Sequence, residues 1–322
     1  MSTERNRPTF YPSLLVVLVA LLVAPGWASA QSRFSGVVVF GTSLSDPGNA
    51  FALSGNASTP PDFTLNPFLI PSAPYAMGGH HFSNGATWIE QYGGSRGLAA
   101  TARAAFSPGE AQAANFAVGA ARAYDDGINV NLSRQVSAFL NRSGGAAPAN
   151  RLYVIEMGSN DVRDSFQVYA GGGNGGPVLQ AALAAIAANI QSLYAAGARE
   201  FLVWIVPNIA LTPALRSLGP AAGALAGALT QSFNTGLSQV LAQLELALPG
   251  VRFMRLDAYR ILNDIVANPA AFGLSTVTAS CLTPNTEPFI CQHADEFLFW
   301  DGIHPTRSGH AILARETELV VY

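Results

Sequence analysis

Lysine is absent from this sequence of 322 residues, and charged side chains of either sign are scarce. All 17 basic residues are arginines, and 20 acidic residues outnumber them, which leaves a formal net charge of −3. Because nucleic-acid-binding domains usually carry a basic face, this balance argues against a nucleic-acid partner. Charged residues make up only 11% of the chain and hydrophobic residues 49%, which excludes a disordered chain and predicts a folded domain with a large core.

Cysteine is nearly absent as well, since Cys281 and Cys291 are the two that the sequence contains. Together with the nearby His293 they would form a poor structural metal site, because such sites take four ligands. In an exported chain an even number of cysteines indicates a disulfide. We therefore predict a Cys281–Cys291 disulfide and expect neither a metal nor a cofactor.

Residues 1–30 have the pattern of a secretory signal peptide. A basic start is followed by the apolar run 14–24, and Ala28-Ser29-Ala30 matches a cleavage site. The alternative, an uncleaved membrane anchor, is disfavoured because the apolar run is short. Beyond it we expect no segment of membrane-spanning length. The prediction is a secreted or periplasmic protein in which residues 31–322 form a single domain.

Short apolar runs alternate with helical patterns through this domain. Two long helices are predicted where apolar residues recur three and four positions apart, at 179–193 and 225–248. Continuous apolar runs are typical of parallel strands covered by helices on both faces, which predicts an α/β fold. We expect segments 54–79 and 279–296 to be loops, the first of them long and on the surface. The predicted strands are 36–40, 114–118, 152–157, 201–206 and 251–256.

Four segments bring reactive groups to one edge of this predicted sheet. Ser43, Gly119 and Asn160 each follow a strand, and ligands bind at the carboxyl ends of strands in open α/β sheets. Asp301 and His304 stand three apart in a turn, where a carboxylate can orient an imidazole that takes a proton. Each group alone has an ordinary explanation, as a turn residue, a helix cap or a strand-ending glycine. Their conjunction predicts a site with a nucleophilic serine.

Five short segments carry a family resemblance. With them the chain resembles the GDSL, or SGNH, hydrolases of lipid and carbohydrate esters, including secreted bacterial lipases and esterases and autotransporter passenger domains. The resemblance implies a flavodoxin-like three-layer α/β/α sandwich with a central, mostly parallel sheet. The segments are FGTSLSDPGN at 40–49, FSNGATWIE at 82–90, NFAVGAA at 115–121, MGSNDV at 157–162 and FWDGIHPT at 299–306.

The resemblance also implies a role for each matching residue. Ser43 would be the nucleophile, with Asp301 and His304 completing a triad. The backbone N–H groups of Ser43 and Gly119 and the side chain of Asn160 would form the oxyanion hole. Supporting roles fall to Thr42, Asp46, Asn49 and Asp161, of which Asp46 and Asn49 are expected to brace the loop after Ser43. The implied partner is a small-molecule or lipid ester, with transient contact to lipid surfaces.

Thr42 departs from the family, which usually has an aspartate there to support the nucleophile turn. Threonine can make weaker local hydrogen bonds to the backbone, so activity is expected to survive. Two rival functions stay open: an acyltransferase on the same site, and a non-catalytic binding module if Thr42 has disabled the turn. Aromatic residues near His304 could line an acyl pocket or belong to the core; they are Phe289, Phe297, Phe299 and Trp300.

Overall fold

The computed structural model describes residues 1–3, 33–66 and 68–321. Its central sheet has four parallel strands in the order β1-β2-β3-β4. Four of the five predicted strands are therefore found, with no end moved by more than one residue. The predicted signal peptide falls almost wholly outside the described residues and stays a prediction. The strands are β1 (Val37–Gly41), β2 (Leu152–Glu156), β3 (Glu200–Ile205) and β4 (Arg252–Asp257).

The fifth predicted strand, 114–118, is not a regular strand, although it follows the free edge of β1. The N–H of Val39 donates to the carbonyl of Ala114 at 3.0 Å, and the N–H of Phe116 donates back to Val39 at 2.8 Å. The side chain of Asn115 accepts from the N–H of Ala117 at 3.0 Å, a local bond of the kind that competes with a regular ladder. The segment still delivers Gly119 to the edge where β1 ends.

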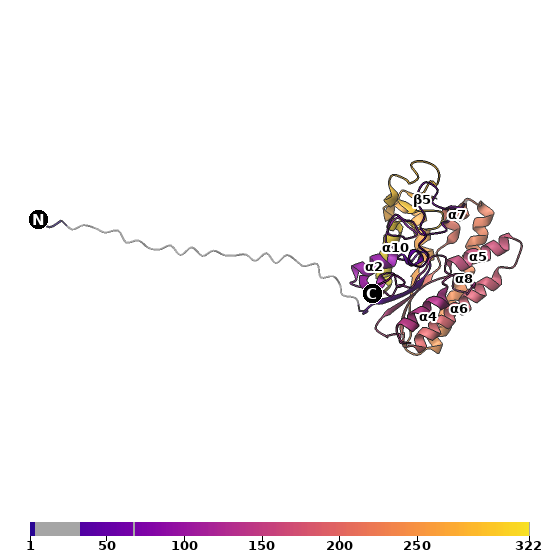
Figure 1. The fold of residues 1–322 in the computed structure, drawn as a ribbon, viewed down its shortest axis with the longest axis horizontal. Coiled ribbons are helices and arrows are strands. Elements are labelled where there is room, and N and C mark those ends of the chain that lie inside the picture. The colour runs from indigo at the N-terminus through magenta and orange to yellow at the C-terminus, as the bar shows by residue number, and fades with distance from the viewer. Residues whose placement is uncertain (4–32, 67, 322) are drawn as a thin grey trace.

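Helices cover both faces of the sheet, and Figure 1 shows α4, α5, α6 and α8 on one side and α2 and α10 on the other. Successive β1 residues enter different cores: Val38 and Phe40 pack on the first side, Val37 and Val39 on the second. This confirms the three-layer α/β/α sandwich. The first layer contains α4 (Leu132–Arg142), α5 (Ser159–Ala170), α6 (Gly176–Ala195) and α8 (Pro220–Ala247), and the second contains α2 (Trp88–Ser95), α3 (Ala99–Ala102), α9 (Ala258–Ala267) and α10 (Arg307–Val321).

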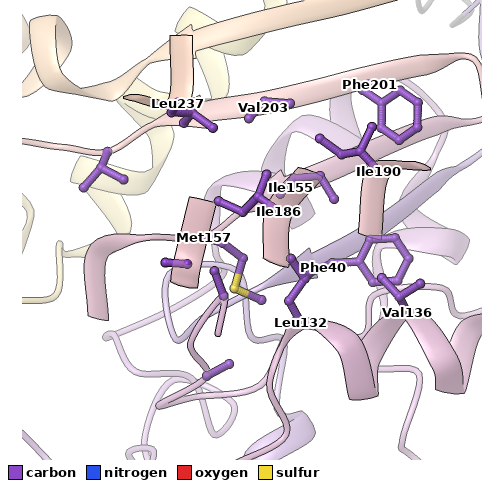
Figure 2. Packing of buried hydrophobic residues seen from close by; sticks show 14 of the residues in the cluster. Phe40, Leu132, Val136, Ile155, Met157, Ile186, Ile190, Phe201, Val203 and Leu237 are labelled. Atoms are coloured by element: carbon purple, nitrogen blue, oxygen red, sulfur yellow. The ribbon is translucent and has the colours of Figure 1, made fainter. Parts of the chain in front are cut away.

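The first core joins the sheet to its helical layer through large apolar side chains. Figure 2 shows Phe40, Ile155 and Val203 of the strands facing Leu132, Ile186 and Leu237 of the helices. All of them are almost fully buried, and burial of one such side chain contributes roughly 1.5–3 kcal/mol. The packing holds the strand ends in a fixed relation, so the loops that follow them start from rigid positions.

Helix α6 corrects the expectation that no later segment has membrane-spanning length. By length and composition its residues Gly176–Ala195 could cross a membrane. The many alanines of α6 raise its hydropathy, whereas its larger apolar residues follow a helical period and face the core. Leu179, Ile186, Ile190 and Leu193 are buried against the sheet and the neighbouring helices, which explains the apolar face without a membrane.

Segment 54–79 was predicted to be a surface loop, and this is wrong in part. Phe63 and Tyr75 are fully buried there and pack against Trp300 and the Cys281–Cys291 disulfide. Beside them lies a second, two-stranded parallel sheet of β5 (Thr276–Ser280) and β6 (Phe297–Phe299). The segment thus covers a small third core beneath the turn that carries His304.

Two short helices remain, α1 (Asn49–Ser54) and α7 (Pro213–Arg216), with 3₁₀ turns at Ile209–Leu211, Pro269–Phe272 and Ala294–Glu296.

Candidate active site

Ser43, His304 and Asp301 form one continuous chain of hydrogen bonds. The Oγ of Ser43 lies 2.8 Å from Nε2 of His304, and Nδ1 of His304 lies 2.7 Å from Oδ2 of Asp301. Because a carboxylate only accepts, the Nδ1 atom carries the proton and Nε2 is free to accept from the serine hydroxyl. All three side chains are buried, with Ser43 the most exposed at 8%. The arrangement can deprotonate the serine as it attacks.

The turn that carries Asp301 and His304 is closed by its own carboxylate. Oδ1 of Asp301 accepts from the backbone N–H groups of Ile303 at 2.9 Å and His304 at 2.8 Å. The hydroxyl of Ser83 donates to the carbonyl of Pro305 at 2.8 Å, so the segment FSNG holds the other side of the turn. Both contacts hold the imidazole in the direction of Ser43.

Tyr75 adds a contact that the sequence did not predict. Its hydroxyl donates to Oδ2 of Asp301 at 2.7 Å, the same oxygen that meets His304. Burial raises the pKa of Tyr75 far above its usual value, so the phenol keeps its proton and acts as a donor. No local signal could reveal this pair, because 226 residues separate its members.

Thr42 is held by Glu156, the last residue of the neighbouring strand β2. The Thr42 N–H donates to Oε2 of Glu156 at 2.8 Å, and the Thr42 hydroxyl lies 3.0 Å from the same oxygen. Thr42 also makes a long local hydrogen bond, in which the backbone nitrogen of Leu44 lies 3.3 Å from Thr42 Oγ1. Burial raises the pKa of Glu156 to about 7, against the hydrogen bonds from Thr42, which lower it. A carboxyl group thus supports the turn that carries Ser43, but it comes from β2. The sequence signal was the one acidic residue inside the apolar run LYVIEM.

Asp46 and Asn49 make hydrogen bonds within and across the loop after Ser43. Oδ1 of Asp46 accepts from the N–H groups of Gly48 and Asn49 at 2.9 and 2.6 Å. The side-chain amide of Asn49 donates to the carbonyls of Asn115 and Ala117, both at 2.8 Å. The loop after β1 is thereby tied to segment 114–118.

Gly119 lies at the site, but its N–H is occupied. It donates to Oδ2 of Asp46 at 2.8 Å. Burial raises the pKa of Asp46 to about 6, while the hydrogen bonds that it accepts from Gly119 and the backbone of its own loop lower it. A side chain at Gly119 would meet the Phe82 ring, because an added Cβ would lie 2.2 Å from it. That ring lies 5.3 Å from the His304 imidazole, centre to centre, so glycine here allows Phe82 to reach the site.

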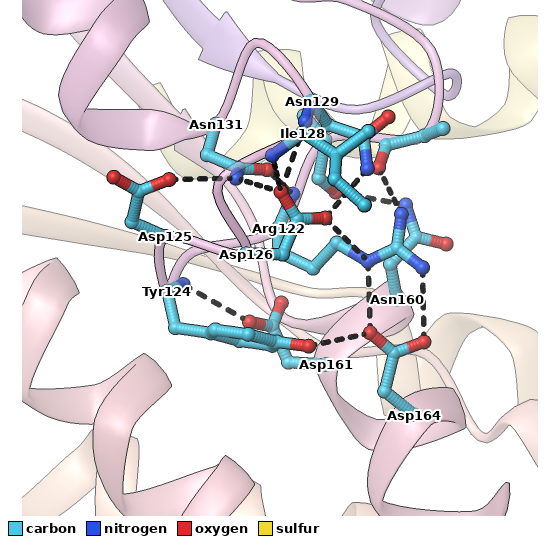
Figure 3. Close-up of polar contacts among 12 residues, drawn as sticks. Arg122, Tyr124, Asp125, Asp126, Ile128, Asn129, Asn131, Asn160, Asp161 and Asp164 are labelled. Atoms are coloured by element: carbon cyan, nitrogen blue, oxygen red, sulfur yellow. Dashed lines mark hydrogen bonds and ion pairs between the residues drawn. The ribbon is translucent and has the colours of Figure 1, made fainter.

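Asn160 lies in the first turn of α5 and lines a common cavity with Ser43. Its Nδ2 donates to the carbonyl of Ala121 at 2.8 Å, which leaves the second hydrogen of the amide available. Asp161 does not face the serine; it accepts from the N–H groups of Ala123 and Tyr124, at 2.9 and 3.2 Å from Oδ1. Figure 3 shows this group, in which Asp164 also pairs with Arg122. Asp161 thus supports the segment on which Asn160 rests.

Two cavities open from Ser43. The first, here called the apolar cavity, has about 880 Å³ of empty space with its mouth included. Among its lining residues are Trp204, Ile261, Leu262, Ile265, Phe299 and Leu313. The second, here called the outer cavity, has more polar residues in its wall, such as Asn56, Ser72 and Asn129. Of the aromatic candidates, Phe299 lines the apolar cavity, whereas Phe289, Phe297 and Trp300 pack in the third core.

No group of three or more His, Cys, Asp or Glu side chains in the described part of the chain could hold a metal ion. The groups that the site does offer are a hydroxyl, an imidazole, a carboxylate, backbone N–H groups and one amide. Such a set can carry out acyl transfer through a serine.

The model of the GDSL-like lipase/acylhydrolase family matches residues 37–317. A GDSL esterase/lipase of Arabidopsis thaliana is 26% identical over 365 aligned residues, which cover 98% of this chain and 94% of that protein. Another from the same plant is 28% identical over 177 residues, 54% of this chain and 51% of that protein. The chain spans about half the length of the first curated relatives that it matches.

Among solved structures, an extracellular lipase from Streptomyces rimosus aligns with a TM-score of 0.39 and 15% identity, covering 88% of this chain and 99% of that one. The family model spans most of the chain and includes each of the five segments discussed above. This chain belongs to the GDSL-like lipase/acylhydrolase family.

Proposed function

We propose that this chain is a secreted serine esterase or lipase that hydrolyses carboxylic esters through an acyl-enzyme on Ser43. The observation that carries the proposal is the unbroken chain of hydrogen bonds from Ser43 through His304 to Asp301, at 2.8 and 2.7 Å. The proposed catalytic domain is residues 31–322, and export rests on the signal-peptide pattern of residues 1–30.

In the proposed mechanism Nε2 of His304 takes the Ser43 proton as Oγ attacks the ester carbonyl. Asp301 stabilises the imidazolium that forms, and Tyr75 holds the carboxylate in place. His304 then returns the proton to the leaving alcohol as the C–O bond breaks. Water, activated by the same imidazole, attacks the acyl-enzyme and releases the acid and free Ser43.

The proposed oxyanion hole consists of the Ser43 N–H, the free hydrogen of the Asn160 amide and the Gly119 N–H. Asn160 follows β2 and Ser43 follows β1, two paired strands, so both donors have rigid supports. Gly119 can contribute only if its N–H gives up its hydrogen bond to the carboxyl group of Asp46 and donates to the oxyanion instead.

Replacing Asn160 by alanine should lower kcat by about 10²–10³-fold, which is the usual cost of one lost oxyanion donor. KM should change little, since the donor acts on charge that develops in the transition state. Steady-state kinetics on p-nitrophenyl butyrate would measure both constants. A kcat equal to that of the wild type would show that Asn160 is not an oxyanion donor. Asp164→Asn is a matched control on the same helix, because Asp164 pairs with Arg122 rather than facing Ser43.

The apolar cavity supports an acyl chain as the group bound next to Ser43. Filling it by Ile261→Trp should lower kcat/KM for p-nitrophenyl palmitate by about 10- to 200-fold, the range for a few apolar contacts in a pocket. Hydrolysis of p-nitrophenyl acetate should stay within about 2-fold, because the acetyl group needs no such space. Leu246→Trp is the control, since Leu246 is 89% exposed. Equal losses on both esters would mean that the acyl chain lies elsewhere.

Hydrolysis of p-nitrophenyl esters from acetate to palmitate by the purified protein tests the function itself. Glycerol added to the same reaction separates hydrolysis from acyl transfer, because a transferase would form acylglycerol in place of free acid. A fluorophosphonate that labels Ser43 would exclude a non-catalytic module. Failure of the folded protein both to hydrolyse these esters and to react with the probe would contradict the proposal.

A further inference from the structure

Arg163 stands one helical turn after Asn160 in α5, so the two side chains share a face of the helix. It lines both the apolar cavity and the outer cavity. Few residues do so: besides Arg163 they are Ser43, Asn160, Ile303 and His304. Arg163 thus belongs to the junction of the two cavities, where the proposed ester would react.

The charge of Arg163 is alone at this junction. Of the described residues that line either cavity, Arg163 is the one with a permanent charge, and none is acidic. An anionic group in either cavity would therefore meet one cation and no carboxylate from the walls.

The acidic neighbours of Arg163 are engaged elsewhere. Asp164 accepts from Nε and Nη2 of Arg122 at 2.8 and 3.0 Å and from the hydroxyl of Tyr124. Asp161 accepts from the backbone of Ala123 and Tyr124. Figure 3 shows both carboxylates turned to these partners.

No hydrogen bond or ion pair links the guanidinium of Arg163 to another side chain in the described part of the chain. The side chain is half-buried, and burial lowers its pKa. An arginine that is partly withdrawn from water and has no carboxylate partner favours an anionic ligand. Guanidinium groups bind phosphate and carboxylate in paired, charge-assisted hydrogen bonds.

We propose that Arg163 binds an anionic group, a phosphate or a carboxylate, on the alcohol side of the ester substrate. The apolar cavity would hold the acyl chain, so the more polar outer cavity is left for the alcohol part. The substrate class is then an amphiphilic ester with an uncharged acyl chain and an acidic alcohol portion. This inference rests on the proposed function and narrows its substrate.

The test compares two substrates that differ in one phosphate: 1-hexanoylglycerol 3-phosphate and 1-hexanoylglycerol. The short acyl chain keeps both in solution as monomers. Release of hexanoic acid would be measured for the wild type, Arg163→Gln and Arg163→Lys, with p-nitrophenyl hexanoate as a third substrate. Arg315→Gln is the control for net charge, because Arg315 is exposed on α10.

The wild type should prefer the phosphate ester by about 10- to 100-fold in kcat/KM, as expected for hydrogen bonds to a charged group. Most of the preference should come from KM. Arg163→Gln should abolish it and leave 1-hexanoylglycerol and p-nitrophenyl hexanoate within about 2-fold. Arg163→Lys should keep part of it, and Arg315→Gln all of it.

Equal rates on the two glycerol esters in the wild type would overturn the inference. So would equal losses on all three substrates in Arg163→Gln, because such losses would show a structural role. A wild type that hydrolyses p-nitrophenyl hexanoate but neither glycerol ester would overturn the inference as well. If no ester reacts at all, the proposed function has failed and this inference falls with it, a result distinct from the others.

Discussion

Replacing Ser43 by alanine is expected to abolish ester hydrolysis, with kcat lowered by about 10⁶-fold, the usual loss in a serine triad. The proposed acyl-enzyme forms on Oγ, and among the described residues no other hydroxyl is hydrogen-bonded to the His304 imidazole. The mature protein and the variant would be compared on p-nitrophenyl esters from acetate to palmitate. The fold should persist, because the change removes one atom at the edge of the sheet.

Ser72→Ala is the matched control for this experiment. Ser72 lines the outer cavity, and its hydroxyl donates to the carbonyl of Thr64 at 3.2 Å, away from His304. The control should hydrolyse esters and bind a fluorophosphonate as the wild type does, and Ser43→Ala should do neither. Residual activity of Ser43→Ala above about one part in 10³ would point to a different nucleophile, since the oxyanion hole and binding alone retain only a small part of the rate.

Thr42→Asp, which brings in the residue usual in the family, is expected to damage this protein. The new carboxylate would stand where Thr42 now donates to Glu156, and two buried carboxyl groups in contact cannot both ionise. We expect kcat/KM to fall about 10²-fold, the effect of a small displacement of a reacting group. The loss relative to wild type should grow as pH rises from 6 to 8.5. A carboxyl whose pKa is already raised to about 7 holds its proton below that pH and loses it above.

Glu156→Gln supplies the rescue. In the double variant Thr42→Asp/Glu156→Gln the amide can donate to the new aspartate, so the pair is again complementary. Its kcat/KM should return to within about 5-fold of the wild type, and the extra pH dependence should vanish. Thermal unfolding of all four proteins would show whether stability follows the same cycle. If Thr42→Asp alone matches the wild type across this pH range, then Glu156 does not support the nucleophile turn as described.

Much of the fold followed from local pattern. Four apolar runs form parallel strands, and two periodic segments form α6 and α8. A strand buried on both faces is continuously apolar, whereas a helix buried on one face has apolar residues three and four positions apart. The predictions were wrong where side chains or distant packing overrode the pattern. Asn115 uses its own amide on the backbone of segment 114–118, and Phe63 and Tyr75 draw a polar-looking loop into a small core.

The candidate site residues fall into the same two groups. Ser43, Asn160 and the Asp301/His304 pair could be named from motifs, because each follows a predicted strand or shares one turn. Tyr75 and Glu156 could not, since each is hydrogen-bonded to a residue far away in the chain. Arg163 could not either, since the cavities that it lines are formed by distant segments. Even Gly119, predicted as a free donor, is engaged by Asp46 across 73 residues.

The sequence by itself therefore determined the α/β class, the family and the residues that meet at the sheet edge, because strand and turn chemistry is local. The tertiary structure alone decided which carboxylate supports Thr42, which phenol holds Asp301, and which cation faces the two cavities. These depend on contacts between segments that only the folded sheet and its two helical layers bring together.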